Sequence, residues 1–310
     1  MREIMISLLS LIVYNLSAQS FRPQWISFPE VDSISQIWFR QTYITAQRPI
    51  LANIHIITTG QIELYVNGYN VSTDTRLPYR EYNDRTKPIC MSFNVTRFLH
   101  SDSNTIAVWY SPSYPHIESR QISLNYNGMM PDGEKFSYNA DNEWICRKAN
   151  ISLTTDSEEE FLSPSNDAVW NYSEYEPACW LRAQQQDIDS ISTILHQESF
   201  YKSRHVTRII KPECYEISKD SIGYRFTPNF QGYIRITLRE AKKGEKIDIG
   251  GLKYICNGNN DEQAYRKFTQ KYCSNIIVSG DKRFRKSQIQ SIEGIEINTY
   301  YILLFKKLKF

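Results

Sequence analysis

Apolar and polar residues alternate with a period of two along most of this chain, and this pattern most constrains its fold. In Gln61–Val66 every second residue is Ile, Leu or Val, which is the spacing of a strand that buries one face. Asn67-Gly68 follows at once. This pair favours a two-residue type I′ turn, because both central residues of that turn need a positive φ. The sequence therefore predicts a hairpin, with Tyr69–Val71 as its returning strand.

The same alternation recurs along the chain, and long amphipathic helix patterns are missing. Further strands are predicted at Ile37–Ile44, Ala52–Ile56, Thr105–Tyr110, Gln121–Tyr126, Trp144–Leu153, Tyr233–Leu238, Lys246–Ile249, Asn275–Ser279 and Gly294–Asn298. Many short strands separated by polar turns are typical of antiparallel sandwiches. We therefore expect an all-β protein with two consecutive β-sandwich domains, the first of them a jelly roll.

Three segments are distinguished along the 310 residues. The apolar stretch Ile4–Tyr14 is too short to span a bilayer, and small residues up to Ala18 follow it, so residues 1–18 predict a secretory signal peptide. Localisation is then secreted or periplasmic, and no later stretch predicts a transmembrane segment. We expect the first sandwich at 19–190 and a smaller β-domain at 195–310. Thr154–Glu176 predicts a surface loop whose acidic run at 158–160 is solvated.

The composition argues against several classes of function. With 36 Lys+Arg and 34 Asp+Glu the net charge is +2, so no basic excess points to nucleic acid. Only 12 glycines occur and no phosphate-binding glycine motif is present. Six cysteines occur without a CxxC pair. Export would allow disulfides, but strand-like surroundings favour unpaired core thiols, and the spacing predicts neither a metal site nor a cofactor.

Catalytic groups are not evident in the sequence. Glycoside hydrolysis needs two carboxyl groups across the scissile bond. The acidic residues that could supply them lie in polar, loop-like sequence, where solvated carboxylates are the simpler interpretation: Asp141 with Glu143, Asp167, Glu174 with Glu176, and Asp261 with Glu262. The five histidines are scattered. We therefore assign no catalytic residue.

Sugar binding is the chemistry that the sequence leaves open. Aromatic rings stack on the CH faces of sugars, and neighbouring polar groups fix the hydroxyls. Three loops combine such residues, and their candidate ligand-binding side chains are Tyr79, Tyr82, Tyr114, Trp170, Tyr172 and Tyr175. The competing interpretation is that these rings cover the edge of the core.

The first half contains short sequence motifs that resemble those of a known family. Trp38-Phe39-Arg40-Gln41, the run Gly60–Gly68, and Phe93–Thr96 followed by Leu99 and Asn104–Val108 are together similar to the galactose-binding-like sandwich of family 2 and family 78 glycoside hydrolases. Asn94 stands where that family usually has Asp, and Asp102-Ser103 replaces its usual Gly.

The second half resembles one branch of those enzymes. Tyr224-Arg225-Phe226 with Asn229–Gly232 is similar to the start of the second β-domain of bacterial α-L-rhamnosidases, with Thr227 in place of an Asp. The runs 261–268, 279–281 and 292–297 look like the Bacteroidetes members. In that family an (α/α)6 barrel with the catalytic carboxylates follows the β-domains, and the chain holds no sequence for it.

The resemblance implies three possible roles. The first is an exported, non-catalytic carbohydrate-binding protein whose partner is an oligosaccharide or polysaccharide, with rhamnose-containing glycans as the implied class. The second is a truncated or split α-L-rhamnosidase-like hydrolase that acts with a separate catalytic chain. The third is a periplasmic structural or assembly module without a ligand. The first role implies no enzymatic activity, whereas the second leaves it open.

Overall fold

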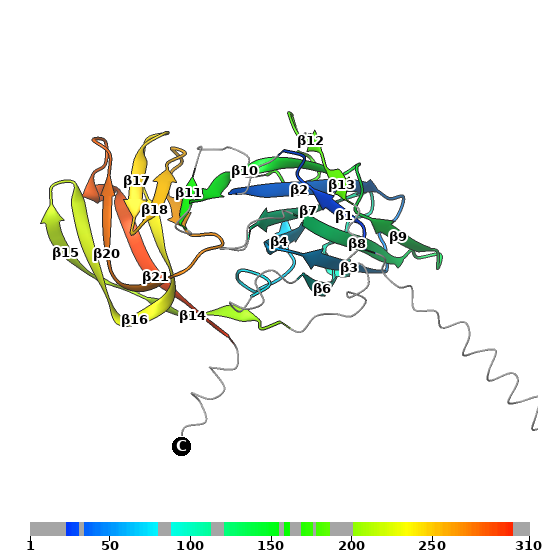
Figure 1. The fold of residues 1–310 in the computed structure, drawn as a ribbon, viewed down its shortest axis with the longest axis horizontal. Coiled ribbons are helices and arrows are strands. Elements are labelled where there is room, and N and C mark those ends of the chain that lie inside the picture. The colour runs from blue at the N-terminus through cyan, green and yellow to red at the C-terminus, as the bar shows by residue number, and fades with distance from the viewer. Residues whose placement is uncertain are drawn as a thin grey trace, which may run out of the picture.

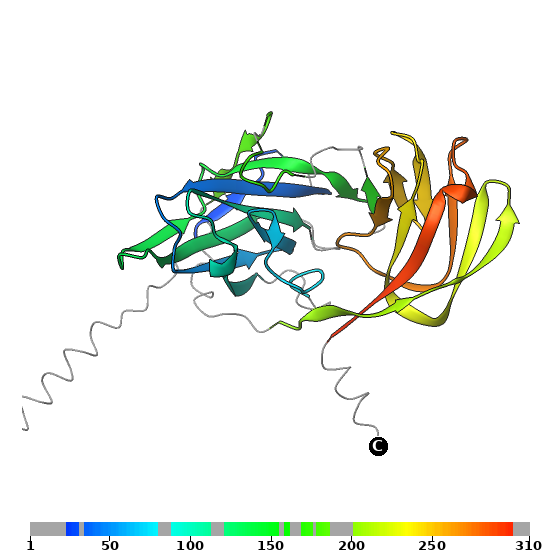
Figure 2. The same ribbon diagram turned by 180° about the vertical axis from the view of Figure 1, so that it is seen from behind.

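The computed structural model describes residues 23–30, 34–79, 88–112, 121–154, 158–161, 169–175, 178–186 and 201–299. Strands are the dominant secondary structure of these residues, with two short 3-10 turns beside them, so the prediction of an all-β chain is confirmed. Figures 1 and 2 show two β-units side by side, which we call the first unit (residues 23–186) and the second unit (residues 201–299). The described residues contain no helix that is long and apolar enough to cross a membrane.

The first unit is a sandwich of two antiparallel layers. One layer has the strand order β13-β1-β8-β3-β6, with β9 paired to β8. Its bounds are β1 Trp25–Ser27, β3 Leu51–Thr58, β6 Ile89–Asn94, β8 Gln121–Met129, β9 Lys135–Asn139 and β13 Gln184–Gln186. The other layer has the order β11-β10-β2-β7-β4-β5, with β12 paired to β10. Its bounds are β2 Ser35–Ile44, β4 Gln61–Val66, β5 Tyr69–Asn70, β7 Ser103–Ser111, β10 Ile145–Leu153, β11 Glu159–Phe161 and β12 Leu181–Arg182.

The core of the first unit lies between these layers. Alternate residues of β3 and β4, such as Ile54, Ile56, Ile62 and Leu64, are fully buried and pack in one cluster. Burying aliphatic side chains in this way stabilises the fold by about 25 cal/mol for each Å² removed from water. The period of two seen in the sequence is therefore the inward face of each strand. The 3-10 turn η2, Thr96–Phe98, follows β6.

The predicted hairpin is present at Asn67-Gly68. Both residues have positive φ, 51° and 83°, as a type I′ turn requires. Asn67 is also buried, and its side chain donates to the Asn104 Oδ1 and accepts from the Thr105 amide. The turn residue thus joins β4 to β7.

The second unit has a core of its own. Its strands follow the order β14-β21-β16-β20-β17-β18, with β15 and β19 paired to β16. The bounds are β14 Arg204–Ile210, β15 Glu213–Ser218, β16 Ser221–Leu238, β17 Lys246–Ile249, β18 Leu252–Ile255, β19 Glu262–Tyr265, β20 Lys271–Gly280 and β21 Ile289–Thr299; the 3-10 turn η3 is Lys286–Gln288. The register of β16 against β20 shifts between Arg225 and Phe230. The first half of this long strand also pairs with β15, and the second half also pairs with β19 and β21.

One segment of the first unit is built into the second. β11 pairs with β10 on one side and, through a single parallel pair between Glu160 and Lys253, with β18 on the other. Figure 1 shows β11 between β10 and β18, at the junction of the units. The expectation that residues 158–160 are a solvated charge run is therefore wrong: Glu159 is fully buried, and Glu158 pairs with Arg266 and Lys271.

The other expected segment boundaries lie outside the described residues. The signal peptide at 1–18 belongs to residues 1–22, and the expected domain boundary near 190–195 belongs to residues 187–200. Both stay predictions.

Candidate functional site

The segment 169–175, which carries three of the predicted sugar-binding aromatics, is fixed to the outer face of the first unit by Arg40. The Arg40 guanidinium donates to the carbonyl oxygens of Trp170 (2.9 Å), Tyr172 (3.1 Å) and Tyr175 (3.2 Å). Arg40 is itself buried, and burial lowers its pKa. Three carbonyl acceptors therefore solvate a buried cation, and the same bonds hold the segment to β2.

The aromatic rings of this segment differ in how far they are buried. Trp170 is 4% exposed and stacks on Trp38 with ring centroids 4.9 Å apart. Tyr175 is half-buried, with the Arg40 guanidinium over its ring. Tyr172 is 42% exposed, and its ring covers the α-carbon of Gly68. Of the three, Tyr172 offers the most ring surface to a ligand.

The remaining predicted aromatics do not join this cluster in the described residues. Tyr79 is half-buried at an isolated bridge with Lys202, under the guanidinium of Arg204. Tyr82 and Tyr114 lie outside the described residues. The structure thus brings together Trp170, Tyr172 and Tyr175, and sugar binding by any of the six residues stays a prediction.

The candidate catalytic carboxylates that the structure describes mostly form local hydrogen bonds and ion pairs. The Asp141 side chain accepts from the Glu143 amide, and Glu143 forms an ion pair with Arg182. Asp261 pairs with Arg239. Of the remaining members, Glu262 accepts from two amides of its own loop and Glu174 is exposed, whereas Asp167 and Glu176 lie outside the described residues. These contacts are those of structural carboxylates.

Thiols and imidazoles are equally dispersed. The six cysteines are unpaired, four of them buried, and burial raises the pKa of the Cys146 thiol to about 12. The His55 Nδ1 lies 2.7 Å from the Ser92 hydroxyl. Among the described residues no group of three His, Cys, Asp or Glu side chains could hold a metal ion.

A row of polar side chains crosses the outer face of the second unit where β11 joins it. Lys253 lies opposite Glu160 on one side and Asp248 on the other, and Asp248 lies opposite Ser279. Directly opposed residues of neighbouring strands project on the same side of a sheet. Four strands, β11, β18, β17 and β20, therefore each contribute one polar side chain to this row.

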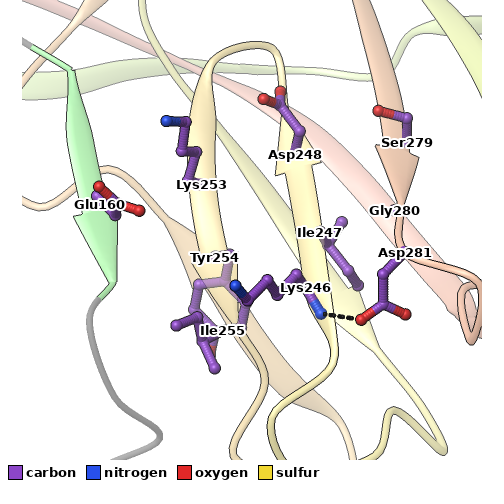
Figure 3. Close-up of a pocket in the computed structure, with 10 residues that line it drawn as sticks. All are labelled: Glu160, Lys246, Ile247, Asp248, Lys253, Tyr254, Ile255, Ser279, Gly280 and Asp281. Carbon is purple, nitrogen blue, oxygen red and sulfur yellow. Dashed lines mark hydrogen bonds between the residues drawn. The ribbon is translucent and has the colours of Figure 1, made fainter.

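A hollow of about 400 Å³ lies over this row. Figure 3 shows Glu160 at one side and Ser279 and Asp281 at the other, with Lys246, Asp248 and Lys253 between them. Arg283 binds the carboxylate of Asp281 and holds its pKa well below the usual range. Among the described residues neither Lys246 nor Lys253 forms an ion pair, and both line the hollow.

A second hollow of about 460 Å³ continues from the first. The two share Asp248 and Ser279, and the second is also lined by Lys271, Tyr272 and Asn275. Tyr272 is 67% exposed. We name the two hollows together the β17–β20 groove. It presents an exposed aromatic ring beside carboxylate, amide, hydroxyl and ammonium groups.

The sequence analysis did not identify this groove. Its polar residues occur singly on alternate positions of ordinary strands, and only the register of four strands brings them into one row. The one available signal was Tyr272, a tyrosine next to Lys271 in the residues just before the predicted strand Asn275–Ser279. Its exposure depends on what packs against it in the folded chain, which the local sequence does not show.

No family model and no curated protein sequence matches this chain, but solved structures resemble its fold. The α-L-rhamnosidase from Dictyoglumus thermophilum matches with a TM-score of 0.76 and 18% identity, over 91% of this chain and 36% of that one. That from Aspergillus terreus gives 0.71 and 16%, over 89% and 36%. The Streptomyces avermitilis enzyme complexed with L-rhamnose gives 0.73 and 15%, over 86% and 29%.

The chain spans about a third of the length of these enzymes. At such identities the likeness concerns the fold alone. The described residues thus share the β-architecture of about a third of an α-L-rhamnosidase chain.

Proposed function

We propose that this protein is a non-catalytic, carbohydrate-binding module and that the β17–β20 groove holds the glycan. The observation that carries the proposal is the exposed Tyr272 ring at the edge of a hollow lined by Asp248 and Asn275. A sugar presents CH groups that pack on an aromatic face and hydroxyls that need fixed donors and acceptors. The groove offers both within one surface.

The fold supports the same proposal. The matched structures are α-L-rhamnosidases, and one of them is complexed with L-rhamnose. L-Rhamnose and rhamnose-containing oligosaccharides are therefore the first ligands to test. In this proposal the first unit is a galactose-binding-like sandwich and the protein comes from the Bacteroidetes branch that its second half resembles.

Calorimetric titration with rhamnose-containing oligosaccharides tests the groove. Tyr272→Ala is expected to weaken binding about five- to tenfold, because stacking on one ring contributes about 1–1.5 kcal/mol. Tyr69→Ala is the matched control, since Tyr69 is 60% exposed on the first unit. Tyr172→Ala examines the aromatic segment predicted from the sequence.

The binding results of these variants show which of the two surfaces holds the sugar. Loss of binding in Tyr272→Ala alone supports the groove, whereas loss in Tyr172→Ala alone moves the site to segment 169–175. If a panel of sugars at millimolar concentration shows no binding to the unaltered protein, the proposal is wrong and a structural or assembly module without ligand takes its place.

A second candidate function is that of the β-part of a glycoside hydrolase. Because the chain spans about a third of each α-L-rhamnosidase, it fits the β-part of a hydrolase whose catalytic barrel is separate. The purified chain is then expected to leave an aryl rhamnoside intact and to support hydrolysis only with a partner chain. Turnover by the chain alone would contradict both candidates.

The proposal includes export to the periplasm or the medium, because the apolar stretch near the N-terminus predicts a signal peptide. Mass spectrometry of the protein from its host is expected to find a mature N-terminus near Gln19. An intact Met1 would remove export from the proposal.

A further inference from the structure

Two buried arginines at the junction of the units share one neutral acceptor. Arg76 and Arg204 are 4% and 8% exposed, and each donates from Nη1 to the side-chain oxygen of Gln270 at 2.9 Å. Arg76 lies in the segment before Tyr79, and Arg204 begins β14. Two guanidinium groups thus converge on a single amide oxygen.

Three of the four remaining nitrogens of this pair lack acceptors in the described residues. Within the described residues, Nε and Nη2 of Arg76 and Nε of Arg204 are buried without a hydrogen-bond partner. Buried guanidinium nitrogens are expensive to leave unpaired. Tyr233 and Tyr79 lie against the two guanidinium groups at 5.3 and 4.2 Å, and these rings supply only part of the missing compensation.

The carboxylates of the junction are already engaged. Glu63 pairs with Lys267, and Glu158 pairs with Arg266 and Lys271. Glu159 accepts from the amides of Lys267 and Phe268 and from Gln36. In the described part of the junction Arg76 and Arg204 form no ion pair. Asp74, the second residue before Arg76, pairs with His205, and the buried Glu159 carboxylate acts on Arg76 only through a longer-range electrostatic attraction.

We propose that Arg76 and Arg204 form a binding site for an oxyanion (a carboxylate, sulfate or phosphate group), and that the Gln270 side chain occupies this site in the present structure. Two guanidinium groups that converge on one oxygen have the donor geometry that planar or tetrahedral oxyanions need. Gln270 is only half-buried, so its side chain can turn outward and leave the site to an anion.

One source of the anion is an acidic ligand bound in the β17–β20 groove. Tyr233, which contacts Arg76, also lines the second hollow of the β17–β20 groove. A sugar acid in the groove and a free inorganic anion are therefore two sources of the same chemistry. The site itself stands on the arginine pair and does not depend on glycan binding.

Thermal unfolding of three variants of the full chain tests the site. Gln270→Glu supplies an internal carboxylate, and we expect it to raise Tm by about 2–4 °C and to remove any effect of added anions. Gln270→Ala opens the site, and phosphate, sulfate or galacturonate is expected to raise its Tm by at least about 2 °C over chloride at equal ionic strength. Gln290→Glu, at an exposed position, is the matched control.

The results distinguish the alternatives. A rise with phosphate alone identifies an inorganic anion, and a rise with galacturonate but not rhamnose identifies a sugar acid; both support the site. No rise in Gln270→Glu beyond that in Gln290→Glu overturns the proposal, as does a Gln270→Ala variant that responds to all three anions as it does to chloride. Tyr272→Ala is expected to leave the phosphate response unchanged, so failure of glycan binding and failure of this site give different results.

Discussion

At the scale of single residues, one buried cation explains why segment 169–175 has an ordered place on the first unit. Arg40 points outward from β2 and is covered by the segment whose three carbonyl oxygens it binds. Trp170 completes the cover by stacking on Trp38. The aromatic residues of this segment are therefore first of all a lid on a charged group, whatever they bind in addition.

Replacing this cation is expected to detach the segment. Arg40→Met keeps the length of the side chain but leaves three carbonyl oxygens without their donor, at a cost of about 2–4 kcal/mol in the free energy of unfolding. Urea unfolding followed by tryptophan fluorescence measures the loss. Arg48→Met removes one exposed hydrogen bond to Thr96 and is expected to cost less than about 0.5 kcal/mol. Equal costs in the two variants would contradict this account.

At the scale of elements, the turn between β4 and β5 serves two purposes. Gly68 allows the positive φ that the turn needs, and its missing side chain leaves room for the ring of Tyr172. A Cβ on Gly68 would lie 2.4 Å from that ring. The hairpin signal in the sequence therefore also marks a tertiary contact with a segment about a hundred residues away.

A comparison of Gly68 with Gly133 separates the cost of the positive φ from the cost of the contact with the Tyr172 ring. Gly133 has a similar φ, 89°, and nothing lies within 4 Å of an added Cβ, so Gly133→Ala is expected to cost only the backbone strain of about 1–2 kcal/mol. Gly68→Ala is expected to cost about 1–2 kcal/mol more, and the difference should shrink in a Gly68→Ala/Tyr172→Ala double variant. Chemical unfolding of the set measures this, and no difference between the single variants would refute the contact.

At the scale of the whole molecule, two cores are joined by a junction that combines polar contacts with aromatic ones, Phe161 on Tyr254 and Trp109 on Phe268. The apolar clusters of the units are separate, while ion pairs and hydrogen bonds cross between them at Glu63, Glu158 and Glu159. β11 adds a strand contact to β18, and both views show it at the junction (Figures 1 and 2). Glu159 links the units directly, because its carboxylate accepts from Gln36 of the first unit and from the amides of Lys267 and Phe268 of the second.

Removing this carboxylate is expected to uncouple the units. We expect the unaltered protein to unfold in one calorimetric transition and Glu159→Ala to unfold in two, because the amides of Lys267 and Phe268 lose their acceptor in a buried place. Glu160→Ala is the matched control: its half-buried side chain faces the groove, and one transition should remain. A single transition with unchanged Tm in Glu159→Ala would show that the junction contributes little.

Much of the fold could be predicted from local sequence. The strand at Gln61–Val66 and that at Lys246–Ile249 have the bounds that alternation predicted, since a strand with one buried face repeats every two residues. The prediction that residues 158–160 form a solvated loop was wrong. A short acidic run has the same composition whether it faces water or basic side chains of another segment.

The candidate site could be predicted far less well. Aromatic loops were visible in the sequence, but whether a ring such as Trp170 is buried or one such as Tyr272 is exposed depends on what packs against it. The groove needs Glu160 from one unit beside Lys253 from the other, and the arginine pair needs Gln270, which lies 194 residues from Arg76.

Neighbouring residues and local φ and ψ preferences were enough to predict the strand pattern, the Asn67-Gly68 turn and the all-β class. The strand register across the junction, the burial of Glu159 and the convergence of Arg76 and Arg204 became visible only in the folded chain. Burial, charge compensation and side-chain stacking depend on segments that are distant in sequence and meet only when the chain has folded.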